Sequence, residues 1–156
     1  IHYYLVNELF HNVDGAVASF WMYKKRNDKL FFGPIWDFDL TLGNRTDGKG
    51  NVYDAWHIRQ SSWFERFFED PLFDDAFKNQ WNSLKMDGSF CNLFNYANAR
   101  VVELSRVQEN NFAVWDISTI PLWGRNNATY QTEADRAIDW LVNRFEWMDA
   151  QINPLH

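Results

Sequence analysis

Apolar residues at the start of the chain recur with the period of an α-helix, and the pattern then changes to that of a β-strand. The helical positions are Ile1, Leu5 and Leu9, with Tyr4 and Glu8 alongside. They predict a helix over residues 1–10, because side chains four positions apart lie on one face. Residues 18–24 instead alternate, and the turn residues Asn27 and Asp28 separate them from a second apolar segment, residues 29–32. This pattern predicts a β-hairpin.

From Trp56 onward every apolar pattern is helical. Four successive apolar faces predict four helices, separated by turn and capping residues. Their members are Trp63, Phe64, Phe67 and Phe68; Phe73, Phe77, Trp81 and Leu84; Phe90, Leu93, Phe94, Ala97, Val101 and Leu104; and Ala134, Ile138, Leu141, Phe145 and Met148. Asp70 and Pro71 are expected to end the first helix and begin the second, and Ser89 is the expected N-cap of the third.

These elements predict an α+β fold that is mostly α, with a small β-hairpin next to a helical bundle. A length of 156 residues suits one domain. We expect a single domain over residues 1–156, with a helix, the hairpin and an acidic motif in residues 1–45 and the bundle in residues 56–153. The last helix is expected to close this bundle with a buried Trp140. Because the chain begins inside a helical pattern, we expect it to be a fragment or a processed form of a longer protein.

Composition and charge exclude several classes of protein. The 15 Lys and Arg residues against 21 Asp and Glu residues give a net charge of −6, which disfavours binding to the phosphate backbone of nucleic acid. No apolar stretch approaches the ~20 residues that span a bilayer, so no membrane span is expected. The one cysteine, Cys91, cannot close an intramolecular disulfide, and its place on an apolar helix face predicts that it is buried.

The candidate chemistry lies in two acidic segments that flank the predicted hairpin. Asp14 precedes the hairpin, and Asp37 and Asp39 follow it within an apolar run. A hairpin returns the chain on itself and would bring Asp14 and Asp37 near one mouth. Acids in an apolar run are costly to bury unless they are hydrogen-bonded, paired with cations or bound to metal, and Mg²⁺ takes such oxygen ligands. In the alternative interpretation, Asp37 and Asp39 cap a turn or pair with Arg45 or Arg59.

Several segments of the chain resemble the signature of the spore-coat CotH kinase family of bacterial secreted and spore-surface proteins. They are residues 4–10 (YLVNELF), 12–14 (NVD), 19–24 (SFWMYK), 33–40 (GPIWDFDL), 81–84 (WNSL) and 140–149 (WLVNRFEWMD). The block over residues 33–40 is the specific one. The resemblance covers essentially the whole chain, but only the C-terminal part of the family's domain. It therefore implies a kinase-like C-terminal lobe.

The resemblance implies an atypical protein kinase that uses Mg²⁺ and transfers phosphate from ATP to Ser residues of other coat or surface proteins. Asp14 would orient the acceptor hydroxyl or accept its proton, and Asp37 would bind the metal. Asn12 would either hold the catalytic loop or touch the substrate. Ser19 stands where ordinary kinases place an Asn ligand, and Asp39 replaces the Gly of Asp-Phe-Gly, either as a further ligand or as the cap of a turn. The spore coat or the cell surface is the expected location.

Two departures from ordinary kinases limit the expected activity. The neutral hydroxyl of Ser19 is a weaker ligand than Asn, which argues against a second metal ion. The phosphate-covering loop and its Lys have no replacement, because the Gly-Lys-Gly sequence at residues 48–50 is too short and follows the site. We therefore expect residues 1–156 alone to transfer no phosphate and to bind ATP weakly.

The second hypothesis is a non-catalytic module that binds carbohydrate or another protein. Four Trp residues are candidates for a sugar-stacking platform: Trp56, Trp63, Trp115 and Trp123. Aromatic residues make up 19% of the chain, an excess that either core packing or ligand contact can explain. Helical spacing favours the core for most of the Trp residues.

Overall fold

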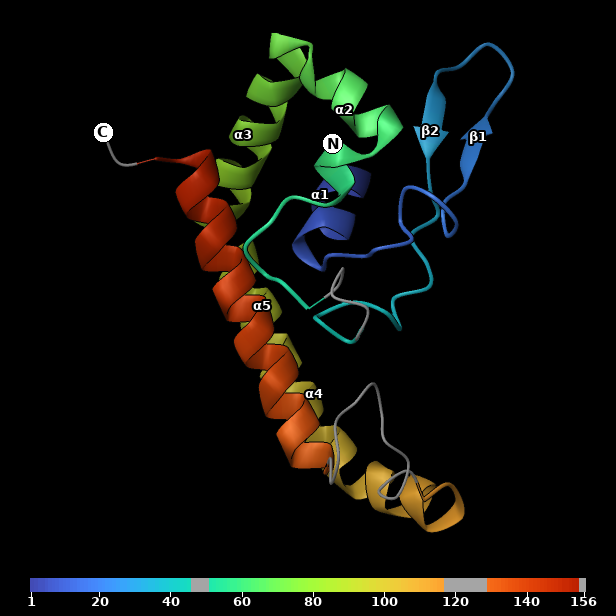
Figure 1. Cartoon of the computed structure of the whole chain (residues 1–156), viewed down its shortest axis with the longest axis vertical. Helices are drawn as coiled ribbons and strands as arrows, with labels where there is room; N and C mark the ends of the chain where they lie inside the picture. Colours follow the sequence, from blue (N-terminus) through green and yellow to red (C-terminus); the bar gives the residue numbers. More distant parts are fainter. Residues whose placement is uncertain (46–50, 117–128, 155–156) are drawn as a thin grey trace.

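The computed structural model describes residues 1–45, 51–116 and 129–154, and within these it is mostly helical. The elements in chain order are α1 (His2–Leu9), β1 (Met22–Lys24), β2 (Leu30–Phe32), the 3₁₀ helix η1 (Ile58–Gln60), α2 (Ser62–Phe68), α3 (Pro71–Met86), α4 (Ser89–Val114) and α5 (Tyr130–Ile152). The predicted α+β fold, mostly α with one hairpin, is confirmed (Figure 1).

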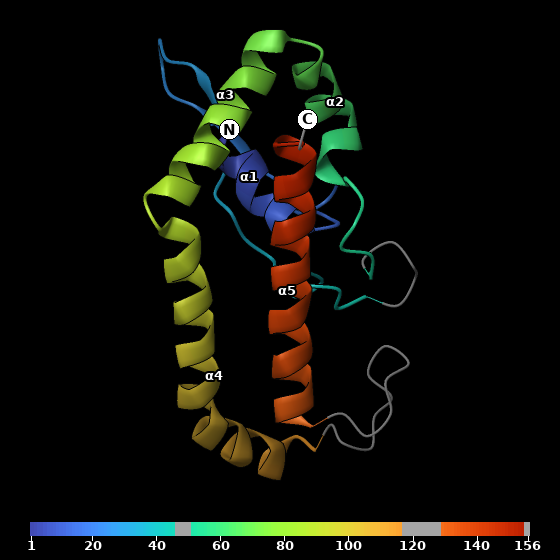
Figure 2. The same ribbon diagram turned by 90° about the vertical axis from the view of Figure 1, so that its left-hand side faces the viewer.

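Helices α4 and α5 form a long antiparallel pair that extends away from the rest of the molecule (Figures 1 and 2). The N-terminal half of α5 lies beside α4, and its C-terminal half reaches back to α1 and α3. The hairpin stands on the other side of α1 from α5 (Figure 1). Helix α5 therefore connects the projecting pair with the part of the fold that carries the hairpin and α1.

Aromatic rings fill the core where α1, α2 and α3 meet. Tyr4 is fully buried, and its ring lies 4.9–5.3 Å from the rings of Phe64, Phe68 and Phe77. A second group joins α3, α4 and α5, with Trp81 stacked on Phe145 and both against Phe90. Edge and offset contacts of this kind stabilise aromatic pairs beyond the area that they bury. Core packing thus accounts for much of the aromatic excess.

The predicted helix boundaries are largely confirmed. The Asp70 carboxylate accepts the Leu72 amide at 2.9 Å, and Pro71 is the first residue of α3. The N-cap of α4 is different, because Ser89 is the first helical residue and Gly88 is the cap. Gly88 has φ +80°, a conformation that glycine adopts without steric cost, and the chain bends there between α3 and α4 (Figure 2).

The hairpin has one face on the core and one face outward. Its register pairs Met22 with Phe32, Tyr23 with Phe31 and Lys24 with Leu30. The Phe32 ring packs inward, 5.4–5.5 Å from the rings of Tyr3 and Phe64. Tyr23 and Phe31 stack on each other at 5.3 Å and remain exposed. Alternation along the strands therefore leaves an aromatic surface facing away from the core.

Three predictions of burial are wrong, at Cys91, Trp63 and Leu104, the last of which is 47% exposed. Cys91 is exposed, and Trp63 is 47% exposed. Each follows or precedes a residue that faces the core, Phe90 and Phe64 respectively. Neighbouring positions on a helix point about 100° apart, so these two side chains turn away from the core. Separately, none of the helices in the described part of the chain is long and apolar enough to cross a membrane.

Trp140→Ala should lower the free energy of unfolding by about 3–5 kcal/mol, the cost of emptying a large buried site. Trp140 is 7% exposed, its Nε1 donates to the Asn51 carbonyl at 3.2 Å, and its ring lies against Gly43. Urea unfolding measures the change. Trp115→Ala is the matched control, because Trp115 is 68% exposed; equal midpoints for the two variants would contradict the expected burial of Trp140.

Candidate functional site

A tight turn directly after α1 carries Asp14. The main-chain carbonyl of Asp14 accepts the amides of residues 17–19 at 2.9–3.1 Å. The Tyr3 hydroxyl donates to the Gly15 carbonyl at 2.7 Å and fastens the turn to α1. Only glycine fits at position 15, because a Cβ there would lie 2.3 Å from Oδ1 of Asn7. The small residues after Asp14 thus let the turn lie directly on the helix.

The side chain of Asn12 holds the main chain of both acidic segments. Its Oδ1 accepts the Asp14 amide at 3.3 Å, and its Nδ2 donates to the Asp37 carbonyl at 3.4 Å. The same Nδ2 donates to Oδ1 of Asn7 at 3.0 Å, and Asn7 in turn donates to the Tyr3 carbonyl. Asn12 is 1% exposed. Its burial favours the interpretation in which Asn12 holds the loop over the one in which it touches substrate.

A second contact joins the two acidic segments through their side chains. Oγ of the buried Ser19 donates to Oδ2 of Asp37 at 2.8 Å. Asp37 has φ +64°, a left-handed conformation that Asp adopts more readily than most residues. The structure therefore brings Asn12, Ser19 and Asp37 together with the turn that carries Asp14, as the predicted hairpin requires.

The acids of the Asp-Phe-Asp segment are not buried, contrary to the expectation from their apolar surroundings. Asp37 and Asp39 are both exposed, and so is Trp36, at 47%. The segment runs over the surface after the hairpin, so its apolar residues do not mark a core. Among the described residues, the buried acid is Glu8, which is 0% exposed. The only signal for Glu8 in the sequence was its position beside the apolar face of the first helix.

The cation partners of the predicted acids also differ from expectation. Nη1 of Arg45 lies 3.8 Å from Oδ1 of Asp14, and both side chains are partly exposed. Arg59 pairs with Asp74 at 3.2 Å. The main-chain carbonyl of Asp39 accepts a hydrogen bond from Asn44, whereas its carboxylate accepts none from the residues that the structure describes. The turn-capping role of Asp39 therefore finds no support there.

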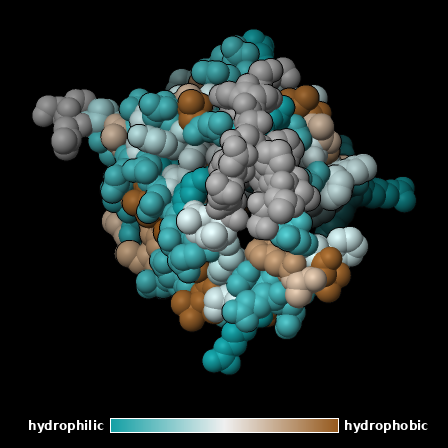
Figure 3. Space-filling model, turned by 60° about the horizontal axis from the view of Figure 1, so that its bottom comes forward, coloured by the Kyte–Doolittle hydropathy of each residue, from teal (hydrophilic) through white to brown (hydrophobic). Residues whose placement is uncertain are grey.

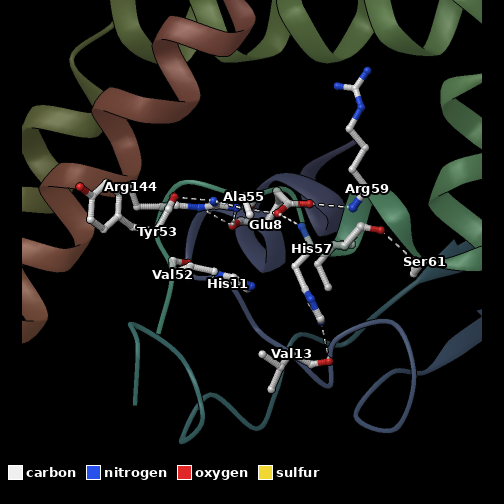
Figure 4. A network of polar contacts seen from close by, with 11 residues as sticks. Glu8, His11, Val13, Val52, Tyr53, Ala55, His57, Arg59, Ser61 and Arg144 are labelled. Carbon is white, nitrogen blue, oxygen red and sulfur yellow. Dashed lines mark hydrogen bonds and ion pairs between the residues drawn. The ribbon is translucent and has the colours of Figure 1, made fainter. Parts of the chain in front are cut away.

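A buried ion pair supports the site from behind (Figure 4). Nη2 of Arg144 donates to Oε1 of Glu8 at 2.6 Å, and neither side chain has any exposed surface. The Glu8 carboxylate also accepts the amides of His57 and Arg59 at 2.9 and 2.7 Å. Burial lowers the pKa of Arg144, and the charge of Glu8 acts against that shift. These bonds fix α1, which carries Asn7 and precedes Asn12, against α5.

The donor set at Asp37 fits Mg²⁺ shared with phosphate. Among the described residues, no three His, Cys, Asp or Glu side chains gather as a metal cage. Mg²⁺ does not need one, because it commonly keeps waters and takes one or two carboxylates together with substrate phosphates. Asp37 offers an exposed carboxylate whose Oδ2 is held by Ser19 and whose Oδ1 accepts no hydrogen bond from a described residue. The exposed carboxylate of Asp39 lies two positions further along.

An aromatic surface adjoins these carboxylates. Trp21 and Trp36 are 58% and 47% exposed, with ring centroids 6.3 Å apart. The stacked pair of Tyr23 and Phe31 continues this surface along the hairpin. We call these four residues the hairpin aromatic surface. Because Trp36 directly precedes Asp37, a planar ring bound on this surface would lie beside the acidic site.

The four Trp residues proposed as a sugar platform do not form one. Trp56 is half-buried with its ring 5.0 Å from that of Trp147. Trp63 belongs to α2 and Trp115 follows the last residue of α4, and α2 and the C-terminal end of α4 are far apart (Figure 1). Trp123 and the Gly-Lys-Gly sequence at 48–50 lie outside the described residues. The described surface at the lower end of the molecule is mostly hydrophilic, with scattered apolar side chains (Figure 3).

Comparison with known proteins identifies a family. The family model described as CotH kinase protein matches residues 1–148 of the chain. No curated protein and no solved structure matches it significantly. The matched range contains both acidic segments, the hairpin between them and the residues of the buried ion pair.

The free energy of unfolding should decrease as the pH is lowered, because of His11, which directly precedes Asn12 and is 1% exposed. Nδ1 of His11 donates to the Val52 carbonyl at 2.9 Å, and its Nε2 has no partner in the described part of the chain. Burial, reinforced by the nearby charge of Arg144, lowers the pKa of His11 to about 3. Between pH 6.5 and 3 the unfolded chain therefore binds a proton at this position that the folded chain does not. The contribution of His11 is a loss of about 1.4 kcal/mol per pH unit as the pH falls through this range.

Urea unfolding of the wild type and of His11→Gln from pH 7 to pH 4 measures this contribution. The variant should lose less stability per pH unit than the wild type. His2→Gln is the control, since His2 is exposed. Parallel stability curves for the wild type and His11→Gln would contradict the neutral, buried state of His11.

Proposed function

The chain belongs to the CotH kinase protein family, and we propose that it carries the acceptor and metal half of a site that transfers phosphate from ATP to Ser residues of a coat or surface protein. The observation that carries this proposal is the pair of hydrogen bonds by which the Asn12 side chain contacts the main chains of Asp14 and Asp37. Phosphoryl transfer needs one carboxylate at the nucleophile and another at the metal that bridges the phosphates. One buried amide fixes the main chains of two such residues relative to each other.

Asp14 is assigned to the acceptor hydroxyl. Its carboxylate is partly exposed and lies on a turn that Tyr3 and Gly15 fasten to α1, so an incoming Ser can reach it. A carboxylate in this position orients the hydroxyl and takes its proton as the bond to phosphorus forms. Asn12 acts as a positioning residue behind Asp14, because it is buried and contacts the main chain.

Asp37 is assigned to Mg²⁺. Ser19 donates a hydrogen bond to one of its oxygens and thereby fixes the orientation of the carboxylate. Asp39 contributes a second exposed carboxylate to the same segment. When bound, Mg²⁺ would supply neutralisation of the phosphate charge. Only hard oxygen groups are assigned to the ion here, consistent with its preference.

The hairpin aromatic surface is assigned to the base of ATP. Base stacking on aromatic side chains depends on planar rings rather than on a specific hydrogen-bond pattern. Trp21 and Trp36 offer such rings, and Trp36 directly precedes Asp37, so a base stacked there would lie next to phosphates bound at Asp37. A bacterial spore coat or cell surface is the proposed setting, since the family is linked to the spore coat.

Replacing each of the two acids in turn should separate metal binding from activation of the acceptor hydroxyl. Asp37→Asn should weaken Mg²⁺-dependent ATP binding about tenfold, because the ion loses a charged ligand. Asp14→Asn should leave Mg-ATP affinity nearly unchanged and lower phosphate transfer by about 10²–10⁴-fold, the usual contribution of a general base. Because residues 1–156 alone are expected to transfer no phosphate, calorimetric Mg-ATP titration and a phosphotransfer assay on a longer parent protein measure the two effects. Asp75→Asn, an exposed change of equal charge on α3, is the control.

Two outcomes would contradict these assignments. If Asp37→Asn binds Mg-ATP like the wild type and Asp75→Asn, Asp37 is not a metal ligand. If both acidic variants instead lose stability in urea along with binding, the acids act in the fold rather than in the reaction. A non-catalytic binding module would then become the leading hypothesis.

Trp21→Ala should weaken ATP binding by about 1–3 kcal/mol, the range for loss of one aromatic ring from a base stack. It should leave the affinity for tripolyphosphate, which has no base, unchanged. Trp63→Ala removes a comparably exposed Trp from α2 and should alter neither affinity. The NMR shift of the Trp21 indole N–H signal on adding ATP gives a second, local readout. If this signal does not move, the base of ATP does not bind at the hairpin.

A further inference from the structure

Four cations gather at the tip of the hairpin. Lys24, Lys25, Arg26 and Lys29 are the only Lys or Arg residues among the first 44 residues of the chain, and all four are exposed. Together with Asp28 they give residues 24–29 a charge of +3, so the rest of the chain carries −9. None of the four forms an ion pair with a residue that the structure describes. Clustered like charges repel one another, and an anion bound among them relieves that repulsion.

The main chain holds these cations within one turn. The Asp28 amide donates to the Lys25 carbonyl at 3.2 Å, and the Asp28 carboxylate accepts the Lys29 amide at 2.7 Å. Lys24 pairs in register with Leu30, which is 55% exposed. The tip therefore presents its cations together with exposed apolar surface.

The tip and the acidic site lie at opposite ends of the hairpin. At the base of the hairpin the Trp21 carbonyl accepts the Gly33 amide at 2.9 Å, and nearby in sequence Ser19 donates to Asp37. Lys24 lies three residues beyond Trp21, which is about 10 Å along an extended strand. A bound segment of about three extended residues would cover the same length.

Charges elsewhere at this end of the molecule favour a single acidic chain over a flat anionic surface. The α2–α3 junction lies at the same end as the hairpin tip in both ribbon views (Figures 1 and 2). It exposes Glu65, Glu69 and Asp70 against one cation, Arg66. A bilayer with anionic lipids would approach these acids together with the tip, and they would repel it. An extended acidic segment can contact the tip alone.

We propose that the hairpin tip, residues 24–29, binds an acidic segment of the acceptor protein, an inference that rests on the proposed function. Clusters of Lys and Arg recognise acidic segments through charge-assisted hydrogen bonds. The acidic residues of the segment would lie three or more positions from the acceptor Ser, because that Ser must reach Asp14, which precedes the hairpin. The tip thereby selects the protein that is modified and takes no part in the transfer step.

Peptide titration of the chain tests this binding without requiring turnover. The probe is a fluorescent peptide with one Ser, three Gly and four Glu residues, and the same peptide with Gln in place of Glu is its uncharged match. The Glu peptide should bind about tenfold more tightly and should lose affinity as salt is added. Lys25→Gln with Lys29→Gln should weaken its binding about tenfold. Arg66→Gln with Arg100→Gln makes the same change of net charge on α2 and α4 and should bind like the wild type.

Three results of this titration would overturn the proposal. The first is equal affinity for the Glu and Gln peptides, and the second is an equal loss in the hairpin variant and the control variant. The third is hairpin-dependent binding to vesicles of phosphatidylglycerol and phosphatidylcholine without binding to the Glu peptide, which would make the tip a lipid-binding site.

A phosphotransfer assay on a longer parent protein tests the link to the acceptor. The hairpin variant, Lys25→Gln with Lys29→Gln, should raise KM for the Glu peptide about tenfold and leave kcat unchanged, because it removes binding that is equal in the ground state and the transition state. An unchanged KM would contradict the assignment of the tip to the acceptor. Failure of the proposed function has a different signature, namely Mg-ATP binding that is indifferent to Asp37→Asn.

Discussion

The buried ion pair between Glu8 and Arg144 is the interaction on which the rest of the structure depends. Removing two charges from water costs several kcal/mol for each ion, and the pair recovers this only if its remaining donors and acceptors are satisfied. Here they are: Arg144 also donates to the carbonyls of Tyr53, Ala55 and Glu8, and the Glu8 carboxylate accepts two main-chain amides. Three segments distant in sequence are thereby held at one point.

Neutral amides, rather than further charges, carry this rigidity from α1 to the surface. Asn7 and Asn12 are both 1% exposed and hydrogen-bonded to each other, and Asn12 reaches the main chain of Asp14 and Asp37. A buried cation at the position of Asn12 would pair with the two carboxylates directly, and they would then not be available to bind metal or substrate. The amide fixes their positions and leaves their carboxylates at the surface, where Ser19 and Arg45 meet them.

The local elements could be predicted from the sequence, because each follows from short-range pattern. The period of Ile1, Leu5 and Leu9 predicts α1, and the turn at Asn27 and Asp28 predicts the hairpin. The pairing of the acidic segments followed from the hairpin between them. Burial was less predictable, since Cys91 and the acidic run sit among apolar neighbours yet face water. The partner of Glu8 lies 136 positions away and leaves no local pattern at all.

The distance in sequence between Glu8 and Arg144 also sets an order of events during synthesis. Asp14, Ser19 and Asp37 are made well before Arg144, so the ion pair that supports their arrangement cannot form until α5 has been synthesised. At roughly 5–20 residues per second, ~7–27 seconds separate the two ends of this bond. During that interval the Glu8 carboxylate remains hydrated, and α1 cannot yet pack against α5. A chain cut short before Arg144 would therefore contain every assigned acid and still lack the arrangement that relates them.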